Sequence, residues 1–233
     1  MVNITPFELI PYLLSKATTV AEARELLSEI NLVNINFADE LPLSPLHWMM
    51  SDGTDAIVIE PMADGLEVYD NPVGVMTNNP PFDKQLFYLN NYRSLSNKNP
   101  ENTFGGDFDL DEYSRGMGGL GLPGDLSSAS RFAKVAFTRA NSYSSSDEAS
   151  SVGQFFHILG SVEQQNGCTF ISDPNLYEYT IYTSCYNTNK GLLYYKTYNN
   201  SQICCVDLNR EDLDSTDLIN YLLINEEQFN FIN

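Results

Sequence analysis

A glycine-rich run that ends near an arginine, GMGGLGLPGDLSSASRF, contains the residues whose spacing most clearly suggests chemistry. Gly116, Gly118 and Gly121 stand at G-x-G-x-x-G spacing, which in a dinucleotide-binding unit holds a pyrophosphate between a strand and a helix. Here polar residues precede the run, and Pro123 interrupts the path to the following helix. We therefore expect no nucleotide site but a tightly packed loop in which one backbone segment approaches another.

The arginine of this run, Arg131, lies in the first turn of the helix that Ser127 or Ser128 is expected to cap. A cation at that position opposes the helix dipole and costs about 0.3–1 kcal/mol relative to a neutral residue. The chain has only 12 lysines and arginines, so the placement needs a reason. Spacing leaves two reasons open: an ordinary salt bridge, or a guanidinium directed at a reacting group.

Two adjacent asparagines follow an apolar stretch in VMTNNPPF, residues 75–82. Asparagine before proline commonly forms a turn, and the local sequence favours that role. The alternative is an amide presented at the end of a strand, where its N–H groups can stabilise the oxyanion of an acyl-transfer reaction. The residues alone leave both roles open.

Residues that commonly bind metals or act as nucleophiles form no recognisable pattern. His47 and His157 lack a second histidine at metal-binding spacing, and no G-x-S-x-G sequence is present. The acidic run DFDLDE lacks the glycine and the glutamate of a calcium loop. The cysteines show no C-x-x-C spacing, which favours reduced thiols in a cytoplasmic protein; they are Cys168, Cys185, Cys204 and Cys205. We expect neither a metal nor a cofactor.

The formal net charge of −19 limits the partners of the chain. Nucleic acids and anionic membrane surfaces both attract clustered lysines and arginines, so the charge disfavours both partners. No stretch approaches the roughly 18–20 apolar residues of a membrane span. The first residues lack the charged start and the cleavage site of a secretory signal. We expect a cytoplasmic protein.

Helix and strand signals occur in clusters along the chain. Thr5 to Glu8 and Thr19 to Glu22 match capping boxes, each followed by apolar residues at helical spacing, so two helices are expected at the start. Further helices are expected at 82–93, 128–143, 148–162 and 211–223, strands at 56–60, 65–70, 73–78, 177–187, 191–198 and 201–208, and an exposed loop at 94–115. Grouped strands indicate an α+β fold. We expect one domain over residues 1–233.

Four segments together resemble the bacterial conjugated bile acid hydrolases, also called bile salt or choloylglycine hydrolases, and their relatives the penicillin V acylases. They are TNNPPFDKQLFYLNNYR, GMGGLGLPGDLSSASRF, QFFHILGSVEQQ and YEYTIYTSCYNTNKGLLYYKTYNNSQI, and they follow in order along essentially the whole chain. The resemblance implies an αββα sandwich of the N-terminal-nucleophile type, with two antiparallel sheets between helical layers. It also implies a homotetramer that hydrolyses the amide joining a bile acid to glycine or taurine.

The resemblance also implies roles for individual residues. In this family the thiol of an N-terminal cysteine is the nucleophile, its own α-amine is the base, and asparagine amides bind the oxyanion. Asn78 matches the asparagine that follows the threonine of TN-x-P, a role in oxyanion and amine positioning. Arg131 matches the arginine of S-x-SRF, which stabilises the thiolate and its acidic partner. Residues 33–45 resemble a loop of the bile acid pocket, with Ile35 and Phe37 expected to contact the steroid.

One part of the family pattern has no match in this sequence. The family's nucleophilic cysteine, with an arginine, an aspartate and a further asparagine, would lie before Met1, and Val2 follows Met1. We therefore expect this chain to be the C-terminal portion of a bile salt hydrolase and to be inactive by itself. The alternatives are a penicillin V acylase-type amidase, and a non-catalytic remnant or oligomer partner.

Overall fold

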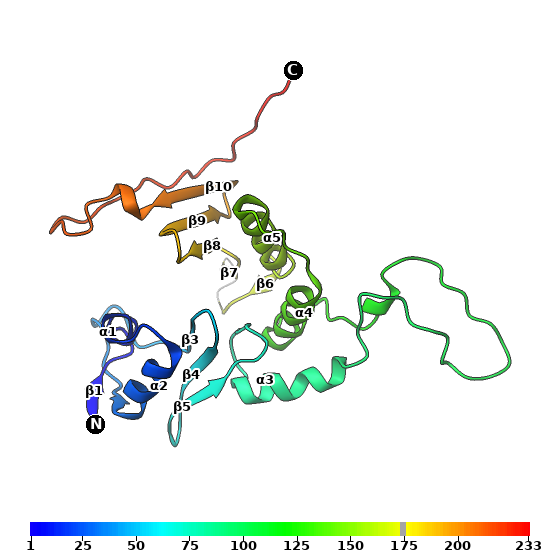
Figure 1. Cartoon of the computed structure of the whole chain (residues 1–233), viewed down its shortest axis with the longest axis horizontal. Helices are drawn as coiled ribbons and strands as arrows, with labels where there is room; N and C mark the ends of the chain where they lie inside the picture. Colours follow the sequence, from blue (N-terminus) through cyan, green and yellow to red (C-terminus); the bar gives the residue numbers. More distant parts are fainter. Residues whose placement is uncertain (173–175) are drawn as a thin grey trace. The chain divides into compact units, whose positions relative to one another are not determined.

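A computed structural model describes residues 1–172 and 176–233, which divide into two compact units, Met1–Phe137 and Thr138–Asn233 (Figure 1). One domain over the whole chain stays a prediction. The first unit contains β1 (Val2–Ile4), α1 (Leu9–Lys16), α2 (Val20–Ser28), β2 (Ile30–Leu32), β3 (Trp48–Ser51), β4 (Ala56–Met62), β5 (Gly65–Asp70), α3 (Phe82–Tyr88), the 3-10 turns η1 (Leu89–Tyr92) and η2 (Met117–Gly119), and the start of α4 (Ser128–Asn141).

The two expected helices at the start are present, and their first turns differ. At α2 the capping box is complete, because Thr19 Oγ1 accepts from Glu22 N at 3.2 Å and the Glu22 carboxylate accepts from Thr19 N. At α1 the Glu8 carboxylate accepts from Thr5 N at 3.0 Å, but the helix begins only at Leu9, after a turn. The short strands β1 and β2, which pair in parallel, were not predicted.

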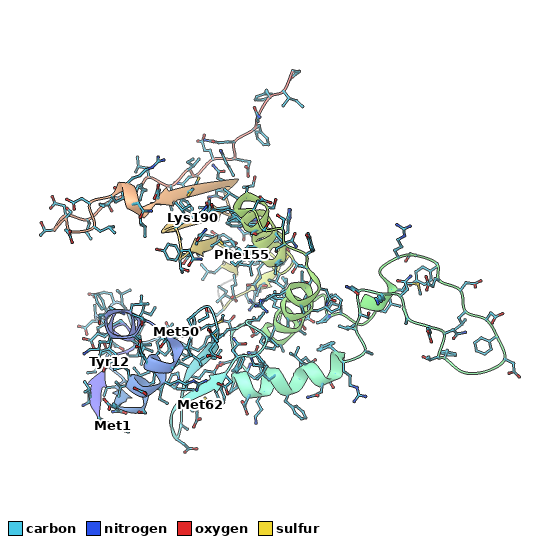
Figure 2. All side chains as sticks on the ribbon, viewed as in Figure 1. Met1, Tyr12, Met50, Met62, Phe155 and Lys190 are labelled. Carbon is cyan, nitrogen blue, oxygen red and sulfur yellow. The ribbon has the colours of Figure 1, made fainter. Side chains whose placement is uncertain are left out.

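The three strands β3, β4 and β5 form an antiparallel sheet in the order β3-β4-β5, which confirms the strands expected at 56–60 and 65–70. Alternate residues of β4 point to opposite faces, and both faces are buried. Ile57 and Ile59 join the core formed with α1, α2, β1 and β2. Tyr12 and Met50, labelled in Figure 2, pack against this core from α1 and β3.

The other face of β4 carries Val58 and Glu60, and it is the face that positions the candidate site. The Glu60 carboxylate is buried and accepts from Phe82 N, the first residue of α3, at 2.9 Å. The Phe82 ring lies 6.0 Å from the ring of Phe132 on α4 and 6.0 Å from that of Tyr69 on β5. These contacts fix the start of α3 and the first turns of α4 against the sheet.

The glycine run forms the close-packed loop that the sequence predicts. Ser96 N donates to Gly118 O at 2.9 Å, and a Cβ on Gly118 would lie 2.0 Å from Lys98 O and 2.4 Å from Ser96 O. No strand is assigned to residues 93–116, the described segment before η2, so the surroundings of a dinucleotide site are not formed. The loop expected at 94–115 is also confirmed, since those residues form neither helix nor strand.

Three predicted elements differ from the structure. The single strand expected at 177–187 is divided into β7 (Tyr177–Glu178) and β8 (Tyr182–Asn187), which belong to different sheets. Residues 73–78 form no strand, because the Asn71 side chain accepts from Gly74 N at 2.8 Å and donates to Val75 O at 3.0 Å, which closes a turn instead. Residues 211–223 form no helix, and their larger apolar side chains, such as Leu218 and Leu222, are exposed. A short helix depends on burying an apolar face, and the described structure buries none there.

The second unit contains the end of α4, α5 (Glu148–Gly160), β6 (Thr169–Phe170), β7 (Tyr177–Glu178), β8 (Tyr182–Asn187), β9 (Leu192–Thr197), β10 (Asn200–Asp207) and η3 (Leu208–Arg210). Strands β8, β9 and β10 form an antiparallel sheet, and the hairpin predicted at NTNKG joins the first two. Lys190 in that turn, labelled in Figure 2, binds Glu148 of α5 at 2.6 Å. Among the described residues, no helix is long and apolar enough to cross a membrane.

Candidate active site

The structure brings Asn78 and Arg131 into direct contact. Arg131 Nη2 donates to Asn78 Oδ1 at 2.8 Å, and Arg131 Nε donates to Leu126 O at 3.0 Å. The arginine is half-buried and the asparagine is exposed. The backbone carbonyl of Leu126 holds the guanidinium at Nε, and a guanidinium can only donate, so the oxygen of the Asn78 amide is the end that faces Arg131.

The orientation of Asn78 leaves its amide nitrogen available. Because Oδ1 faces Arg131, the Nδ2 group with its two protons points elsewhere, and within residues 1–172 and 176–233 it has no hydrogen-bond acceptor. A side-chain amide whose oxygen is held and whose N–H groups are exposed can donate to an oxygen of a bound molecule. This is the arrangement that stabilises a developing oxyanion.

The helix that carries Arg131 is fixed by an aspartate just before it. Asp125 accepts from Ser127 N at 3.0 Å and from Ser130 Oγ at 2.6 Å. Hydrogen bonds from Ser127 and Ser130 lower the pKa of Asp125 to about 2, so its carboxylate is ionised at neutral pH. A negative charge at a helix N-terminus is favourable and offsets the unfavourable placement of Arg131 in the first turn, where the sequence predicts it.

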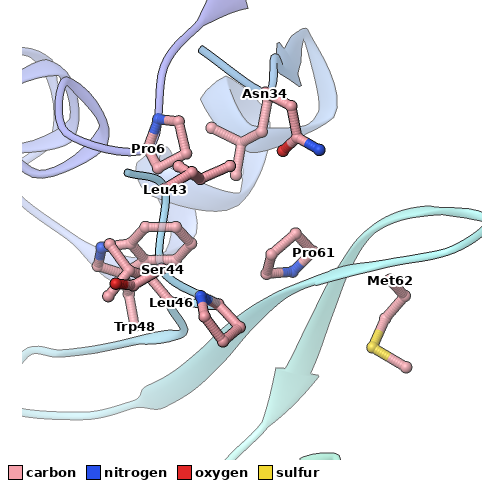
Figure 3. Close-up of a pocket in the computed structure, with 10 residues that line it drawn as sticks. Pro6, Asn34, Leu43, Ser44, Leu46, Trp48, Pro61 and Met62 are labelled. Atoms are coloured by element: carbon pink, nitrogen blue, oxygen red, sulfur yellow. The ribbon is translucent and has the colours of Figure 1, made fainter. Parts of the chain in front are cut away.

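A pocket of about 600 Å³ opens in the same unit, between the segment before β3 and the end of β4 (Figure 3). Eight of its ten lining residues have apolar side chains, and Asn34 and Ser44 are the polar members. The lining residues are Pro6, Leu32, Asn34, Leu43, Ser44, Pro45, Leu46, Trp48, Pro61 and Met62. Figure 3 shows Trp48 and Leu46 at one side and Pro61 and Met62 at the other.

A smaller pocket of about 70 Å³ connects this wall with the turn that carries Asn78. It shares Pro45, Leu46, Pro61 and Met62 with the larger pocket, and it is also lined by His47, Glu60, Asn79 and Pro81. Asn79 is the neighbour of Asn78 in the chain. The turn that carries Asn78 therefore contributes its next residue, Asn79, to the smaller pocket, whereas Asn78 itself lines neither pocket.

Comparison with known proteins identifies the family. Residues 1–221 match the family model described as linear amide C–N hydrolases, choloylglycine hydrolase family. The chain belongs to this family. A bile salt hydrolase/transferase of Lactiplantibacillus plantarum is 60% identical over 232 residues, which cover 100% of this chain and 71% of that relative. The bile salt hydrolase/transferase of Clostridium perfringens is 37% identical, with 99% of this chain and 70% of the relative covered.

Solved structures of the choloylglycine hydrolase family confirm the expected fold class. A variant of the conjugated bile acid hydrolase of Clostridium perfringens superposes with a TM-score of 0.89 at 36% identity, over 100% of this chain and 71% of that one. The penicillin V acylase of Agrobacterium tumefaciens, at 18% identity and a TM-score of 0.68, covers 89% of this chain and 57% of its own, and shares the fold. The chain therefore has the α+β fold of N-terminal-nucleophile hydrolases.

The two residues that the family resemblance suggested for steroid contact are not among the pocket residues. Ile35 and Phe37 are 54% and 68% exposed, and the Phe37 ring packs edge-on against Phe7, 5.1 Å between centroids. Other members of the predicted segment 33–45 do line the pocket. Trp48 and Pro61 were missed, although the apolar run SPLHWMM was a signal for the former. A role for Ile35 and Phe37 in binding stays a prediction.

Within the described residues of this choloylglycine hydrolase, neither histidine and none of the cysteines forms a hydrogen bond with Asn78. His47 lines the smaller pocket, and His157 is exposed in the last turn of α5. The four cysteines all lie in the described part of the second unit, and none forms a disulfide. Within the described residues, no three histidine, cysteine, aspartate or glutamate side chains are grouped closely enough to hold a metal ion.

Proposed function

We propose that this chain supplies an oxyanion-binding amide and a steroid pocket to a hydrolase that cleaves the amide between a bile acid and glycine or taurine. One observation carries the proposal: Asn78 Nδ2 is exposed and without an acceptor in the described structure, while Arg131 holds Oδ1 at 2.8 Å. Attack of a thiol on an amide produces a tetrahedral intermediate with a charged oxygen. Preorganised N–H donors stabilise that charge more than the neutral carbonyl before it.

The chemistry follows from the mechanism that the family resemblance implies. The sulfur of an N-terminal cysteine attacks the amide carbon, and its α-amine takes the thiol proton and returns it to the leaving nitrogen. The C–N bond breaks, glycine or taurine leaves as the amine, and water then releases the bile acid from the thioester. Asn78 acts on the oxygen in both steps, and Arg131 keeps the Asn78 amide in the orientation that both steps need.

The pocket supports a steroid as the acyl part of the substrate. Its volume of about 600 Å³ falls within the range of small-molecule sites, about 300–1,000 Å³, and eight of its ten lining residues have apolar side chains. Ile35 and Phe37 are exposed and flank the lining residue Asn34 in sequence, so contact with the outer part of the steroid belongs to the same proposal. The two relatives named bile salt hydrolase/transferase support a bile acid amide, rather than penicillin V, as the substrate proposed for this chain.

A cytoplasmic location and a homotetramer complete the proposal. The four thiols form no disulfide, which agrees with a reducing compartment. The tetramer rests on the family resemblance alone.

Binding can be measured on the chain itself, because its single tryptophan, Trp48, lines the pocket. Taurocholate, kept below the concentration at which it forms micelles, is expected to change the Trp48 fluorescence saturably as the steroid displaces water from the indole. Leu43→Glu, which places a charge in the pocket wall, should weaken binding at least about tenfold. Leu41→Glu, in the same segment but outside the lining, is the matched control. A linear, unsaturable response would end the assignment of the pocket.

Hydrolysis is tested with a completed hydrolase, meaning this chain joined to the N-terminal segment of the Lactiplantibacillus plantarum relative that the resemblance places before Met1. It is expected to release taurine and glycine from taurocholate and glycocholate at least about tenfold faster than it cleaves penicillin V. The same protein with its leading cysteine changed to alanine is the control. Faster cleavage of penicillin V would favour the acylase alternative, and turnover by the unjoined chain would refute the assigned nucleophile.

A further inference from the structure

Gln85 is the most deeply buried amide side chain near Asn78, and no step of the mechanism uses it. It lies on α3 and is 1% exposed. A buried side-chain amide has two N–H donors and an oxygen acceptor, and each group left without a partner costs free energy. The partners of Gln85 therefore show what this side chain holds in place.

Both N–H donors of Gln85 are used on the turn that carries Asn78. Nε2 donates to Pro80 O at 2.8 Å and, at shorter range, to the backbone carbonyl of Asn78 itself. Two carbonyl oxygens can only accept, so the nitrogen end of the amide must face them. The side chain thus binds the main chain at Asn78 and again two residues later.

The oxygen end of Gln85 is held by a hydroxyl chain that leads to the helix of Arg131. Thr77 Oγ1 donates to Gln85 Oε1 at 2.7 Å, and Ser128 Oγ donates to Thr77 Oγ1 at 3.0 Å. Ser128 is the first residue of α4, and Arg131 in the same helix binds Asn78 Oδ1 at 2.8 Å. These bonds form a closed ring around Asn78, in which α4 holds its side chain and α3 holds its backbone.

We propose that Gln85 is a positioning residue for the Asn78 amide. The inference rests on the proposed function, because it concerns the placement of the donors that bind the oxyanion. Arg131 fixes the direction of the Asn78 side chain, but a contact at the end of the side chain does not fix where the main chain at Asn78 lies. Gln85 provides that anchor from a buried site. A displacement of about 1 Å at a reacting group can cost about 100-fold in rate.

The test follows the Asn78 side-chain amide by NMR in the chain as it is, with Gln85→Met, which keeps the volume and removes every hydrogen bond. The Asn78 Nδ2 resonance is expected to move and to lose order, while the variant stays folded with a lowered melting temperature and the resonances of the second unit stay unchanged. Gln164→Met is the matched control, because Gln164 is a buried amide of the second unit that donates to Thr169 Oγ1 at 3.4 Å. An unchanged Asn78 resonance in Gln85→Met would overturn the proposal.

Gln85→Glu adds a pH dependence of the Asn78 resonance, which a purely structural role of Gln85 would not produce. At neutral pH a carboxylate would face two carbonyl oxygens, so burial and these dipoles should raise its pKa. Below that pKa the neutral carboxyl can donate one hydrogen bond again, so the Asn78 resonance should return toward wild type as pH falls, whereas that of Gln85→Met should not. Absence of this difference would count against positioning.

Two further outcomes keep this inference separate from the proposed function. If Gln85→Met fails to fold, Thr77→Val, which removes the hydroxyl that orients Gln85, must move the Asn78 resonance in the same direction. In the completed hydrolase, Gln85→Met should lower kcat about 100-fold and leave KM within about twofold. If the completed hydrolase does not cleave bile acid amides, the proposed function fails, and the resonances still decide whether Gln85 positions Asn78.

Discussion

Replacing Asn78 by alanine is expected to lower the kcat of the completed hydrolase for taurocholate by about 10²–10³-fold and to change KM by less than about twofold. The substitution removes N–H donors whose partner becomes charged only in the transition state. Steroid binding should be kept, because Asn78 does not line the pocket of Trp48. Initial rates of taurine release over a range of taurocholate concentrations measure both constants.

Two variants separate the donors of Asn78 from its contact with Arg131. In the wild type, Arg131 Nη2 lies 2.8 Å from Asn78 Oδ1. Asn78→Asp keeps an oxygen for this contact but has no side-chain N–H group, so the same loss in kcat is expected. Asn90→Ala is the matched control, since Asn90 is an exposed asparagine whose Nδ2 donates to Phe87 O at 2.7 Å. A wild-type kcat in Asn78→Asp would refute the donor role.

Variants of Arg131 test the same orientation of the Asn78 amide. Arg131→Ala should lower turnover with little loss of folded protein, because a cation in the first turn of α4 opposes the helix dipole and its removal relieves that cost. Arg131→Lys should not restore the rate, since one ammonium cannot reproduce the two contacts that Nε and Nη2 make. Turnover unchanged in Arg131→Ala would contradict the assigned role.

The elements that the sequence predicts correctly are those with a complete local signal. The capping box at Thr19 and the short β-branched strands at 56–60 and 65–70, each bounded by turn residues, are specified by nearby residues, so they form where expected. Strand β1 has only three residues, too few for a periodic pattern, and it forms by pairing with β2, 28 residues later. The predicted strand at 73–78 fails because the Asn71 side chain takes the backbone groups that a strand would need.

Some features of the candidate site could likewise be predicted from the sequence, and others could not. The family motif singles out Asn78 and Arg131, and the positive charge in the first turn of a helix also draws attention to Arg131. Their contact joins residues 53 positions apart, so it becomes visible only in the folded structure. The pocket is harder still. A loop has no period that tells which of its side chains turn inward, and of the segment 33–45 the pocket is lined by Asn34, Leu43, Ser44 and Pro45, whereas Ile35 and Phe37 are exposed. Gln85 carries no sequence signal, because a buried amide on a helix is recognisable only by its partners.

Replacing Gly118 by alanine should destabilise the first unit more than any other glycine-to-alanine change in its loop. The new Cβ would lie 2.0 Å from Lys98 O and 2.4 Å from Ser96 O, and both obstacles are backbone atoms that cannot rotate away. The hydrogen bond from Ser96 N to Gly118 O must then break or lengthen. The free energy of unfolding should therefore fall by at least the amount typical of overpacking, about 1–3 kcal/mol.

The same loop provides the control for that prediction. Gly119→Ala meets no atom within 4 Å and needs no left-handed backbone, so its unfolding midpoint in urea should stay close to that of the wild type. Because the loop leads through Asp125 into the helix of Arg131, Gly118→Ala should also weaken the contact between Arg131 and Asn78, visible as a shift of the Asn78 Nδ2 resonance. Equal urea midpoints for the two variants would mean that the close approach at Gly118 contributes nothing to stability, and that the glycines of this run serve another purpose.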